Sequence, residues 1–103
     1  MEEIPRAEMF LNAARPEVKD AFQELAQEIY KEGALSSKDK SLIALACAIA
    51  IRCDHCVRRH VKHASMAGVG REEMLEAAAV AGLVRAGSGF ASASYILDWL
   101  EGA

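Results

Sequence analysis

The residues best suited to chemistry in this chain gather between positions 53 and 63. This stretch holds two of the three cysteines, as Cys53-x-x-Cys56, and all three histidines. Three cysteines are an odd set for a secreted disulfide framework, whereas a Cys-x-x-Cys pair is typical of redox chemistry or metal binding in a reducing compartment. We therefore expect the function to lie here.

On a helix, Cys53 and Cys56 are i, i+3 neighbours, and Cys56 and His60 are i, i+4 neighbours, so the two thiols and the imidazole share one face. Cβ atoms at this spacing lie about 5 to 6 Å apart, somewhat beyond the ~3.5 to 4.5 Å of a disulfide. A bridge between the cysteines therefore needs a modest adjustment in the first helical turn. A bond closed in this way is more easily reduced, which suits a disulfide that cycles.

A reactive thiol must be ionised, and a free thiol with a pKa of about 8.5 is mostly protonated at neutral pH. The positive end of a helix, the imidazole of His60 and a local excess of basic side chains all lower the thiol pKa. One of the adjacent Arg58 and Arg59 is nevertheless expected to be ordinary solvated surface. The local excess is four basic side chains against one acidic, in a chain of net charge −3: Arg52, Arg58, Arg59 and Lys62 against Asp54.

Zinc binding is the main alternative, because Cys53, Cys56, His60 and His63 are all of zinc-ligand type. On one straight helix, however, the stretch spans about 15 Å, whereas zinc ligands lie about 2.0 to 2.3 Å from the ion. We therefore favour redox chemistry and expect no metal and no cofactor. Covalent haem requires a histidine directly after the second cysteine, and this chain has Val57 there.

A purely structural interpretation also exists, since cysteines are often small buried residues. We adopt it for Cys47, which stands alone in an apolar run, but not for Cys53 and Cys56, whose neighbours are charged residues and imidazoles. His55 points to a different side of an ideal helix from Cys56, and His63 lies two turns beyond that cysteine. A capping or surface role suits either histidine as well as a catalytic one.

Length and composition predict one all-α domain over residues 1–103. Domains cluster around ~100 to 150 residues, so a chain of 103 residues suffices for one. The hydrophobic fraction of 52% with 26% charged residues excludes disorder. Because 20 residues are alanine and only 6% are aromatic, packed helices are favoured over a β-sandwich.

Periodicity, capping patterns and breakers predict five helices and a short helical turn. Pro16 suits a first helical turn, Ser36 with Asp39 forms a capping pattern, and the run 42–51, apolar on nearly every side, should form a central helix. A short helical turn is predicted within residues 2–14. The five predicted helices then run from Pro16 to about Glu32, from Ser36 to a break near Arg52, from about Cys53 to Ala67 with a stop at Gly68, from Arg71 to about Ala86 with a stop at Gly87-Ser88-Gly89, and from Phe90 to about Glu101.

The charge and hydropathy of the chain exclude several partners. A net charge of −3 argues against nucleic-acid binding, which needs a basic face. The longest apolar run has ten residues, well short of the ~20 that cross a bilayer, so no membrane partner is expected. The N-terminus lacks the basic region and apolar stretch of a secretory signal, so the expected location is cytoplasmic.

The pattern Cys53-x-x-Cys56-x-x-x-His60 resembles the core motif of the carboxymuconolactone decarboxylase and AhpD-like superfamily, and the resemblance extends over about residues 15–100. It implies an AhpD-like domain of about five to six helices that assembles as a homotrimer or homohexamer. It also implies a thiol-dependent peroxidase or disulfide reductase acting on a peroxide or a disulfide, with an outside thiol reductant. We favour this function.

The same resemblance implies roles for individual residues. Cys56 is the reactive thiol, Cys53 closes the disulfide on it, and His60 shuttles the proton. His55 matches a histidine that precedes the second cysteine in such enzymes. The family's glutamate, however, falls at Ser41, which cannot serve as a carboxylate base. The proton relay is then incomplete, or an acid from the helix starting at Arg71 or from another subunit completes it, the candidates being Glu72, Glu73 and Glu76.

Two other functions stay open. A lyase or decarboxylase acting on a lactone acid, the other activity of this superfamily, would not need the cysteines and could hold a carboxylate at Arg58 or Arg59. A non-catalytic oligomeric binding protein with a vestigial site is the second, and the departure at Ser41 favours it.

Overall fold

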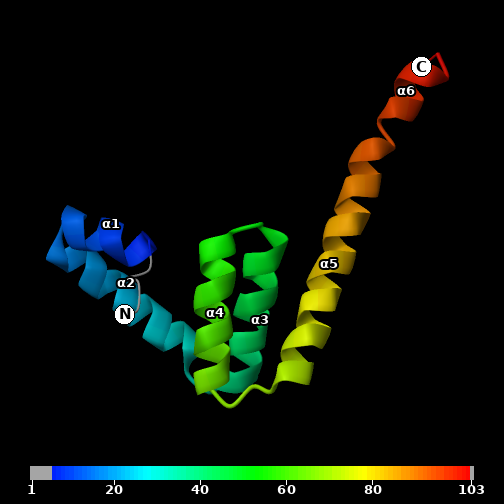
Figure 1. The fold of residues 1–103 in the computed structure, drawn as a ribbon. Coiled ribbons are helices and arrows are strands. Elements are labelled where there is room, and N and C mark those ends of the chain that lie inside the picture. The colour runs from blue at the N-terminus through cyan, green and yellow to red at the C-terminus, as the bar shows by residue number, and fades with distance from the viewer. Residues whose placement is uncertain (1–5, 103) are drawn as a thin grey trace.

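The computed structural model describes residues 6–102, which form six α-helices and no strand (Figure 1). The prediction of an all-α fold with about five to six helices is confirmed. Of the predicted turn within residues 2–14, positions 6–14 form a helix and positions 2–5 lie outside the described residues. The helices are α1 (Arg6–Ala14), α2 (Pro16–Tyr30), α3 (Ser37–Ala50), α4 (Asp54–Met66), α5 (Arg71–Ala93) and α6 (Ile96–Leu100).

α2 begins with Pro16 in its first turn, as predicted, but ends at Tyr30 rather than Glu32. It ends there because the backbone of Lys31 turns to φ −58° and ψ 148°, outside the helical region. The hydroxyl of Ser37 donates to the Tyr30 carbonyl at 2.7 Å and so satisfies one of the carbonyl groups at the helix end. The first turn of α3 thus ties down the end of α2.

α3 and α4 form a helical hairpin whose ends follow the sequence signals. The Ser36 side chain accepts the Asp39 amide at 3.0 Å, which confirms the predicted cap. The predicted break near Arg52 is also confirmed, since this residue has a left-handed backbone with φ 60°. After α4, Gly68 has φ 87°, a conformation that glycine adopts without strain. The sequence therefore predicts both the turn before α4 and the turn after it.

The prediction that Gly87-Ser88-Gly89 ends a helix is wrong, because α5 continues to Ala93. A glycine stops a helix when it takes a left-handed conformation after the last turn, and neither of these two has a positive φ. Within a helix each glycine costs only about 1 kcal/mol relative to alanine, which the helical turns on both sides outweigh. The predicted helix from Phe90 to Glu101 is corrected accordingly: residues 90–93 belong to α5, and α6 is a short separate helix.

The core lies where α3 packs against α4 and α5. The predicted central position of the apolar run is confirmed, since α3 carries Leu45 and Ala48, which are 2% and 3% exposed. Cys47 corrects our expectation of a buried cysteine, because it is exposed. It lies one helical turn from the exposed Ile43 and Ile51, on a face of α3 that neither α4 nor α5 covers.

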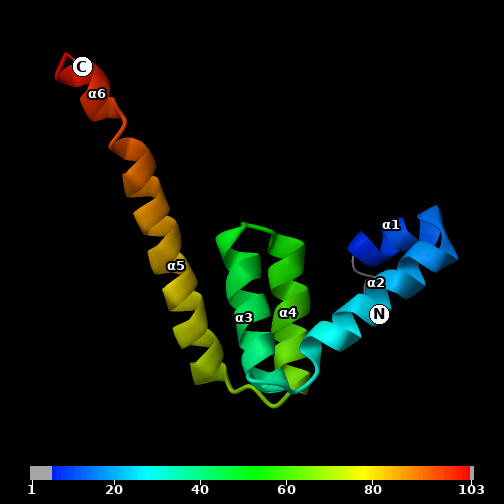
Figure 2. The same ribbon diagram turned by 180° about the vertical axis from the view of Figure 1, so that it is seen from behind.

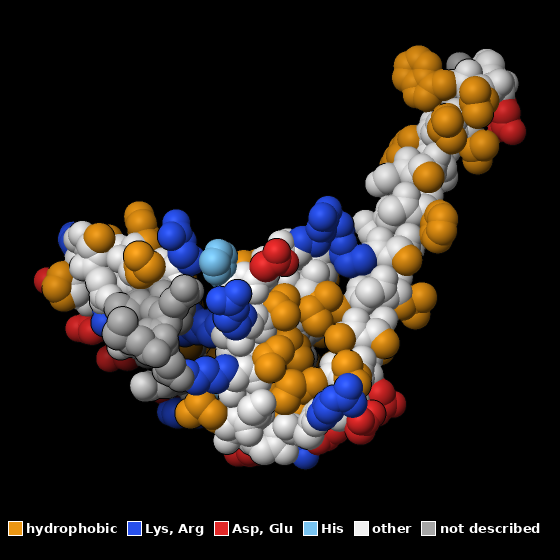
Figure 3. Space-filling view, in the orientation of Figure 1, with side chains coloured by type: hydrophobic (Ala, Val, Ile, Leu, Met, Phe, Trp, Pro, Cys, Tyr) orange, Lys and Arg blue, Asp and Glu red, His pale blue; other side chains and the backbone are white. Residues whose placement is uncertain are grey.

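The subunit is extended rather than compact. Its radius of gyration is 17.8 Å, against about 13 Å for a compact domain of this length. α5 and α6 lean away from the α3–α4 hairpin on one side, and α1 and α2 extend on the other (Figures 1 and 2). Large apolar side chains line this leaning segment, as Figure 3 shows. Those at least 70% exposed are Leu83, Phe90, Tyr95, Trp99 and Leu100.

Within positions 6–102, none of the helices combines the length and apolar character needed to cross a membrane.

Candidate functional site

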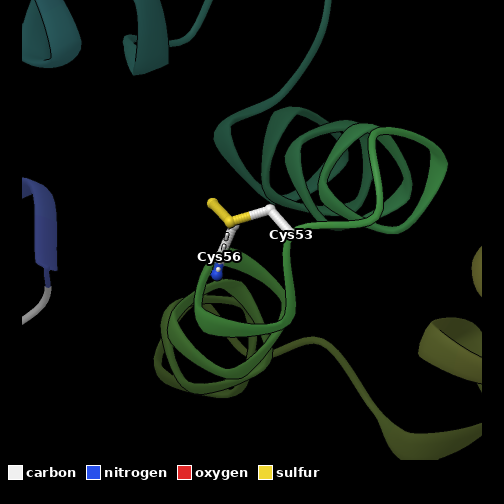
Figure 4. Close-up of a disulfide and its surroundings, with 2 residues drawn as sticks. All are labelled: Cys53 and Cys56. Carbon is white, nitrogen blue, oxygen red and sulfur yellow. Dashed lines mark hydrogen bonds between the residues drawn. A yellow bond between two sulfur atoms is a disulfide. The ribbon is translucent and has the colours of Figure 1, made fainter.

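The turn between α3 and α4 joins Cys53 and Cys56 in a disulfide, with Cα atoms 5.1 Å apart (Figure 4). Cys53 is the N-cap of α4 rather than a helical residue, with φ −101° and ψ 97°. Its Sγ accepts the backbone N–H of Cys56 at 3.2 Å. The adjustment that the bridge requires is thus the departure of the first cysteine from the helix.

Backbone hydrogen bonds hold Cys53 in this position. Its amide donates to the Ala48 carbonyl at 3.2 Å, and the amide of Arg52 donates to the Ile49 carbonyl at 3.0 Å. These bonds tie the turn to the last residues of α3. Because Ala48 belongs to the core, the buried part of α3 fixes where the first sulfur lies.

The electrostatics at the start of α4 favour negative sulfur. Helix N-termini carry a partial positive charge, and an amide directed at a sulfur stabilises its thiolate. The Cys56 amide is directed in this way at Cys53 Sγ. A thiolate formed at Cys53 would therefore lie beside this amide.

His60 lies one turn beyond Cys56 on α4, at i, i+4, and is half-buried. Its Nδ1 is buried and has no hydrogen-bond partner within the described part of the chain. Burial lowers its pKa below the ordinary 6.5, and the positive charges of Arg59 and His63 lower it further. The imidazole is therefore neutral at neutral pH and able to accept a proton. Its proposed part in the reaction stays a prediction.

The other two histidines lie in the first and the last turn of α4. His55 is exposed in the first turn of α4. His63, in the last turn of that helix, packs edge-on against Tyr30 of α2, with ring centroids 4.9 Å apart and an interplanar angle of 69°. His63 thus serves the contact between α2 and α4, whereas His55 has no comparable ring contact among residues 6–102.

Ser41, at the position of the family's glutamate, is 2% exposed and packs in the core. Its hydroxyl donates to the carbonyl of Ser37 one turn earlier, at 3.1 Å. The predicted replacements Glu72, Glu73 and Glu76 lie at the start of α5, at the opposite end of the hairpin from the cysteines (Figures 1 and 2). Within one subunit, these acids do not reach the bridge.

Sequence reasoning did not single out Tyr30, which lies in the angle between α2, α3 and α4. Burial raises the pKa of its phenol above the ordinary 10.0, while Arg59 lowers it and Cys47 raises it. Tyr30 is therefore a protonated hydrogen-bond donor at neutral pH. The only signal in the sequence is a tyrosine at the end of an apolar stripe, which predicts packing rather than a site.

The residues at positions 6–102 include no cluster of three or more His, Cys, Asp or Glu side chains that could hold a metal ion. The sulfurs of Cys53 and Cys56 are bonded to each other, and His63 contacts Tyr30.

Comparison with known sequences connects this geometry to a family. Residues 16–101 match the sequence profile of the carboxymuconolactone decarboxylase family. The chain is 36% identical over 106 residues to "Uncharacterized protein 4 in cox locus" of Paracoccus denitrificans, covering 97% of this chain and 96% of that protein. It is 32% identical over 99 residues to an uncharacterised protein of Cupriavidus necator, covering 96% of this chain and 88% of the relative.

Two solved structures share the fold. A protein from Methanobacterium thermoautotrophicum is 45% identical, with a TM-score of 0.77, over 88% of this chain and 98% of that one. A carboxymuconolactone decarboxylase family protein from Thermotoga maritima, described in connection with an antioxidative response, is 28% identical. Its TM-score is 0.61, over 84% of this chain and 93% of its own.

Proposed function

The chain belongs to the carboxymuconolactone decarboxylase family, and from this premise we propose that it is a thiol-disulfide oxidoreductase with AhpD-like peroxidase chemistry. Cys53 and Cys56 form its redox pair, and His60 moves the proton. The observation that carries the proposal is the bridge at the start of α4, one turn from a neutral imidazole. The antioxidative description of the Thermotoga maritima relative supports the same class of chemistry.

With a hydroperoxide as substrate, His60 takes the proton of the Cys56 thiol, and the thiolate attacks the terminal oxygen of the O–O bond. The bond breaks, Cys56 becomes a sulfenic acid, and the leaving alkoxide takes the proton from His60 to become an alcohol. The Cys53 thiol then attacks the sulfenic sulfur, the disulfide forms, and water leaves. One hydroperoxide and two thiols thus give an alcohol, water and the bridge.

An outside dithiol restores the pair. One of its thiolates attacks Cys56 Sγ, Cys53 leaves as a thiolate, and the second outside thiol displaces Cys56 from the mixed disulfide. The amide directed at Cys53 Sγ stabilises the leaving thiolate. Because this cycle returns both thiols to the reduced form, it suits the cytoplasm, where disulfides are kept reduced.

The serine at position 41 favours disulfide exchange as the stronger of the two activities. Peroxide cleavage needs a proton delivered to the leaving alkoxide, and among the described residues the groups that shift the pKa of His60 are Arg59 and His63, not a carboxylate. Disulfide exchange places a weaker demand on proton transfer, because a thiolate is a far better leaving group than an alkoxide. We therefore propose that the protein exchanges disulfides faster than it reduces peroxides.

We also propose that the protein works as a homotrimer or homohexamer. The support is the extended subunit and the apolar surface of α5 and α6, where Trp99 is 86% exposed. Exposed apolar patches of this kind mark interfaces. Trp99→Asp together with Leu83→Asp should give a monomer in sedimentation velocity, whereas an exposed polar change such as Ser88→Asp should keep the oligomer. A monomeric wild type would contradict this assembly.

Thiol titration tests the redox function. Reduced wild type should show three free thiols and, after one equivalent of hydroperoxide or of a small disulfide, only one, Cys47. Cys53→Ser should form no internal bridge, and after hydroperoxide its Cys56 should be trapped as a sulfenic acid. Cys47→Ser is the matched control and should lose two thiols, as the wild type does. Wild type that keeps all three thiols under mild oxidant refutes the proposal.

The remaining alternatives give different results in the same preparation. A lyase that acts on a lactone acid would keep its activity after both cysteines are alkylated. A binding protein with a vestigial site would show Cys56 with the pKa of an ordinary thiol, near 8.5. A lowered Cys56 pKa with loss of activity on alkylation supports the oxidoreductase.

A further inference from the structure

A cavity of about 340 Å³ is lined by residues of α1, α2 and α4. α1 and α2 lie on the side of the hairpin away from α5 (Figure 1). This volume falls within the range of small-molecule sites. Along α2 its wall carries Lys19, Gln23 and Gln27, which are spaced at i, i+4 and i+8 and so share one helix face. α4 contributes Arg59. The cavity thus combines cationic and amide groups contributed by two helices.

Apolar side chains complete the wall. Phe22 from α2 and Leu11 from α1 both line the cavity. Ligand sites typically pair an apolar lining with a few polar groups that fix orientation. A ligand suited to this cavity therefore has an apolar body and one polar end.

The charge balance indicates which polar end fits. Lys19 Nζ lies 3.8 Å from Glu8 Oε1, so these two charges offset each other, and among the described lining residues Arg59 leaves one net positive charge. The field of Arg59 reaches the neighbouring groups, since it lowers the pKa of both His60 and Tyr30. A guanidinium binds a carboxylate through two parallel hydrogen bonds. The matching ligand is an organic carboxylate.

The cavity is also close to the redox pair along the chain. Arg59 follows Cys56 at i+3 on α4, so the two side chains share a face of that helix and are separated by about 4.5 Å of rise. A carboxylate bound by Arg59 would therefore be anchored on the same face of α4 as Cys56, about one helical turn along the chain.

We propose that this cavity binds a small aryl or alkyl carboxylate, with the acid group on Arg59 and the apolar body against Phe22 and Leu11. Resting on the proposed redox function, we assign the oxidising substrate as an organic hydroperoxide that carries such a carboxylate, with its acid group anchored one helical turn from Cys56. Gln23 and Gln27 supply amide donors to the carboxylate oxygens that the guanidinium leaves free.

Direct binding tests the site without any turnover. Oxidised wild type is titrated calorimetrically with 4-isopropylbenzoate and with the neutral 4-isopropylbenzamide. The acid should bind and the amide should bind at least tenfold more weakly. Arg59→Gln should bind the acid at least tenfold more weakly than wild type, and Arg59→Lys should lose less of the affinity. The matched neighbour variant Arg58→Gln should keep the wild-type affinity. Equal affinity of the acid for wild type and Arg59→Gln overturns the site.

Thiol oxidation tests the assignment as substrate. The rate constants for oxidation of reduced protein by cumene hydroperoxide and by its 4-carboxylate are compared. Their ratio should favour the carboxylate at least tenfold in wild type and fall to about one in Arg59→Gln. A ratio near one in wild type overturns the substrate assignment. If the acid binds through Arg59 but neither peroxide oxidises the thiols, the substrate assignment and the peroxidase activity are overturned, and the thiol titration with a small disulfide then decides whether disulfide exchange remains. Oxidation without Arg59-dependent binding would overturn only the cavity.

Discussion

The first turns of α4 and α5 are capped by different chemical groups. At the start of α5, the Glu73 carboxylate accepts the Gly70 amide at 3.0 Å and also meets Lys38 Nζ at 3.2 Å. At the start of α4, the acceptor is the sulfur of Cys53, and the nearby His60 keeps a buried nitrogen without a partner among the described residues. The carboxylate at the start of α5 thus has both an amide and an ammonium partner, whereas the imidazole near the start of α4 has a nitrogen without a described partner.

The start of α5 is therefore expected to serve stability, and the start of α4 reactivity. Both starts satisfy orphan amides of a helix, as any stable helix must. A capping carboxylate that is already paired has no further chemistry to offer. A capping sulfur can exchange its bonding partner, and the imidazole near it can accept a proton, so these groups can still react. Substitutions at the start of α4 should therefore change rates, and those at the start of α5 should change stability alone.

The largest effect is expected at His60. His60→Gln should slow the oxidation of the thiol pair by about 100-fold, the usual contribution of a positioned acid–base group. The measurement is stopped-flow oxidation of reduced protein by hydroperoxide. His63→Gln is the matched control, because that ring packs against Tyr30, and it should stay within a few-fold of wild type. Equal losses in the two variants would remove His60 from the mechanism.

The pH dependence sharpens the same assignment. Since the pKa of His60 in the folded protein is lowered below 6.5, the neutral, proton-accepting form grows as pH rises through that lowered value. The unfolded chain binds the proton more tightly, so this group's contribution to stability is present above pH 6.5 and is lost as pH falls toward the folded pKa. Urea unfolding between about pH 5 and 7.5 should show this slope in wild type and a weaker one in His60→Gln. Identical slopes would mean that the imidazole is not buried.

A smaller effect is expected at the start of α5. Glu73→Gln should lower the melting temperature by a few degrees and leave the rate of thiol oxidation unchanged, because only a cap and an ion pair are weakened. The pKa of Glu73 is held below the ordinary 4.5, first by the Gly70 amide and then by Lys38. Its contribution is therefore present above about pH 4.5 and lost below, as melting curves at pH 7 and pH 3.5 would show. A changed oxidation rate would break the contrast between the two starts.

Local signals made much of this arrangement predictable from sequence. Ser36 and Pro16 mark helix starts through their own backbone chemistry, and Gly68 supplies a left-handed residue where α4 must end. The pair Cys53 and Cys56 is close in sequence, so its proximity needs no knowledge of the fold. Features set within about one helical turn were accessible without a structure.

Features that depend on packing between residues distant in sequence could not be predicted from the sequence. Nothing local shows which face of an entirely apolar helix is covered, so the exposure of Cys47 was missed. The length of α5 was missed because glycine signals a stop only when the backbone leaves the helix, which its surroundings decide. The cavity at Arg59 combines residues from three helices and follows from their tertiary arrangement alone.

The smallest expected effect concerns the turn that places the first sulfur. Arg52 has φ 60°, which costs a residue with a Cβ about 1 kcal/mol that glycine avoids. Glycine also loses more backbone entropy on folding, so Arg52→Gly should be more stable than Arg52→Ala by only about 0.5 kcal/mol in urea unfolding. Both variants remove the same charge, so their Cys56 thiol pKa values should agree. If these pKa values differ, the backbone of the turn, and not only the charge beside it, sets the reactivity of the sulfur.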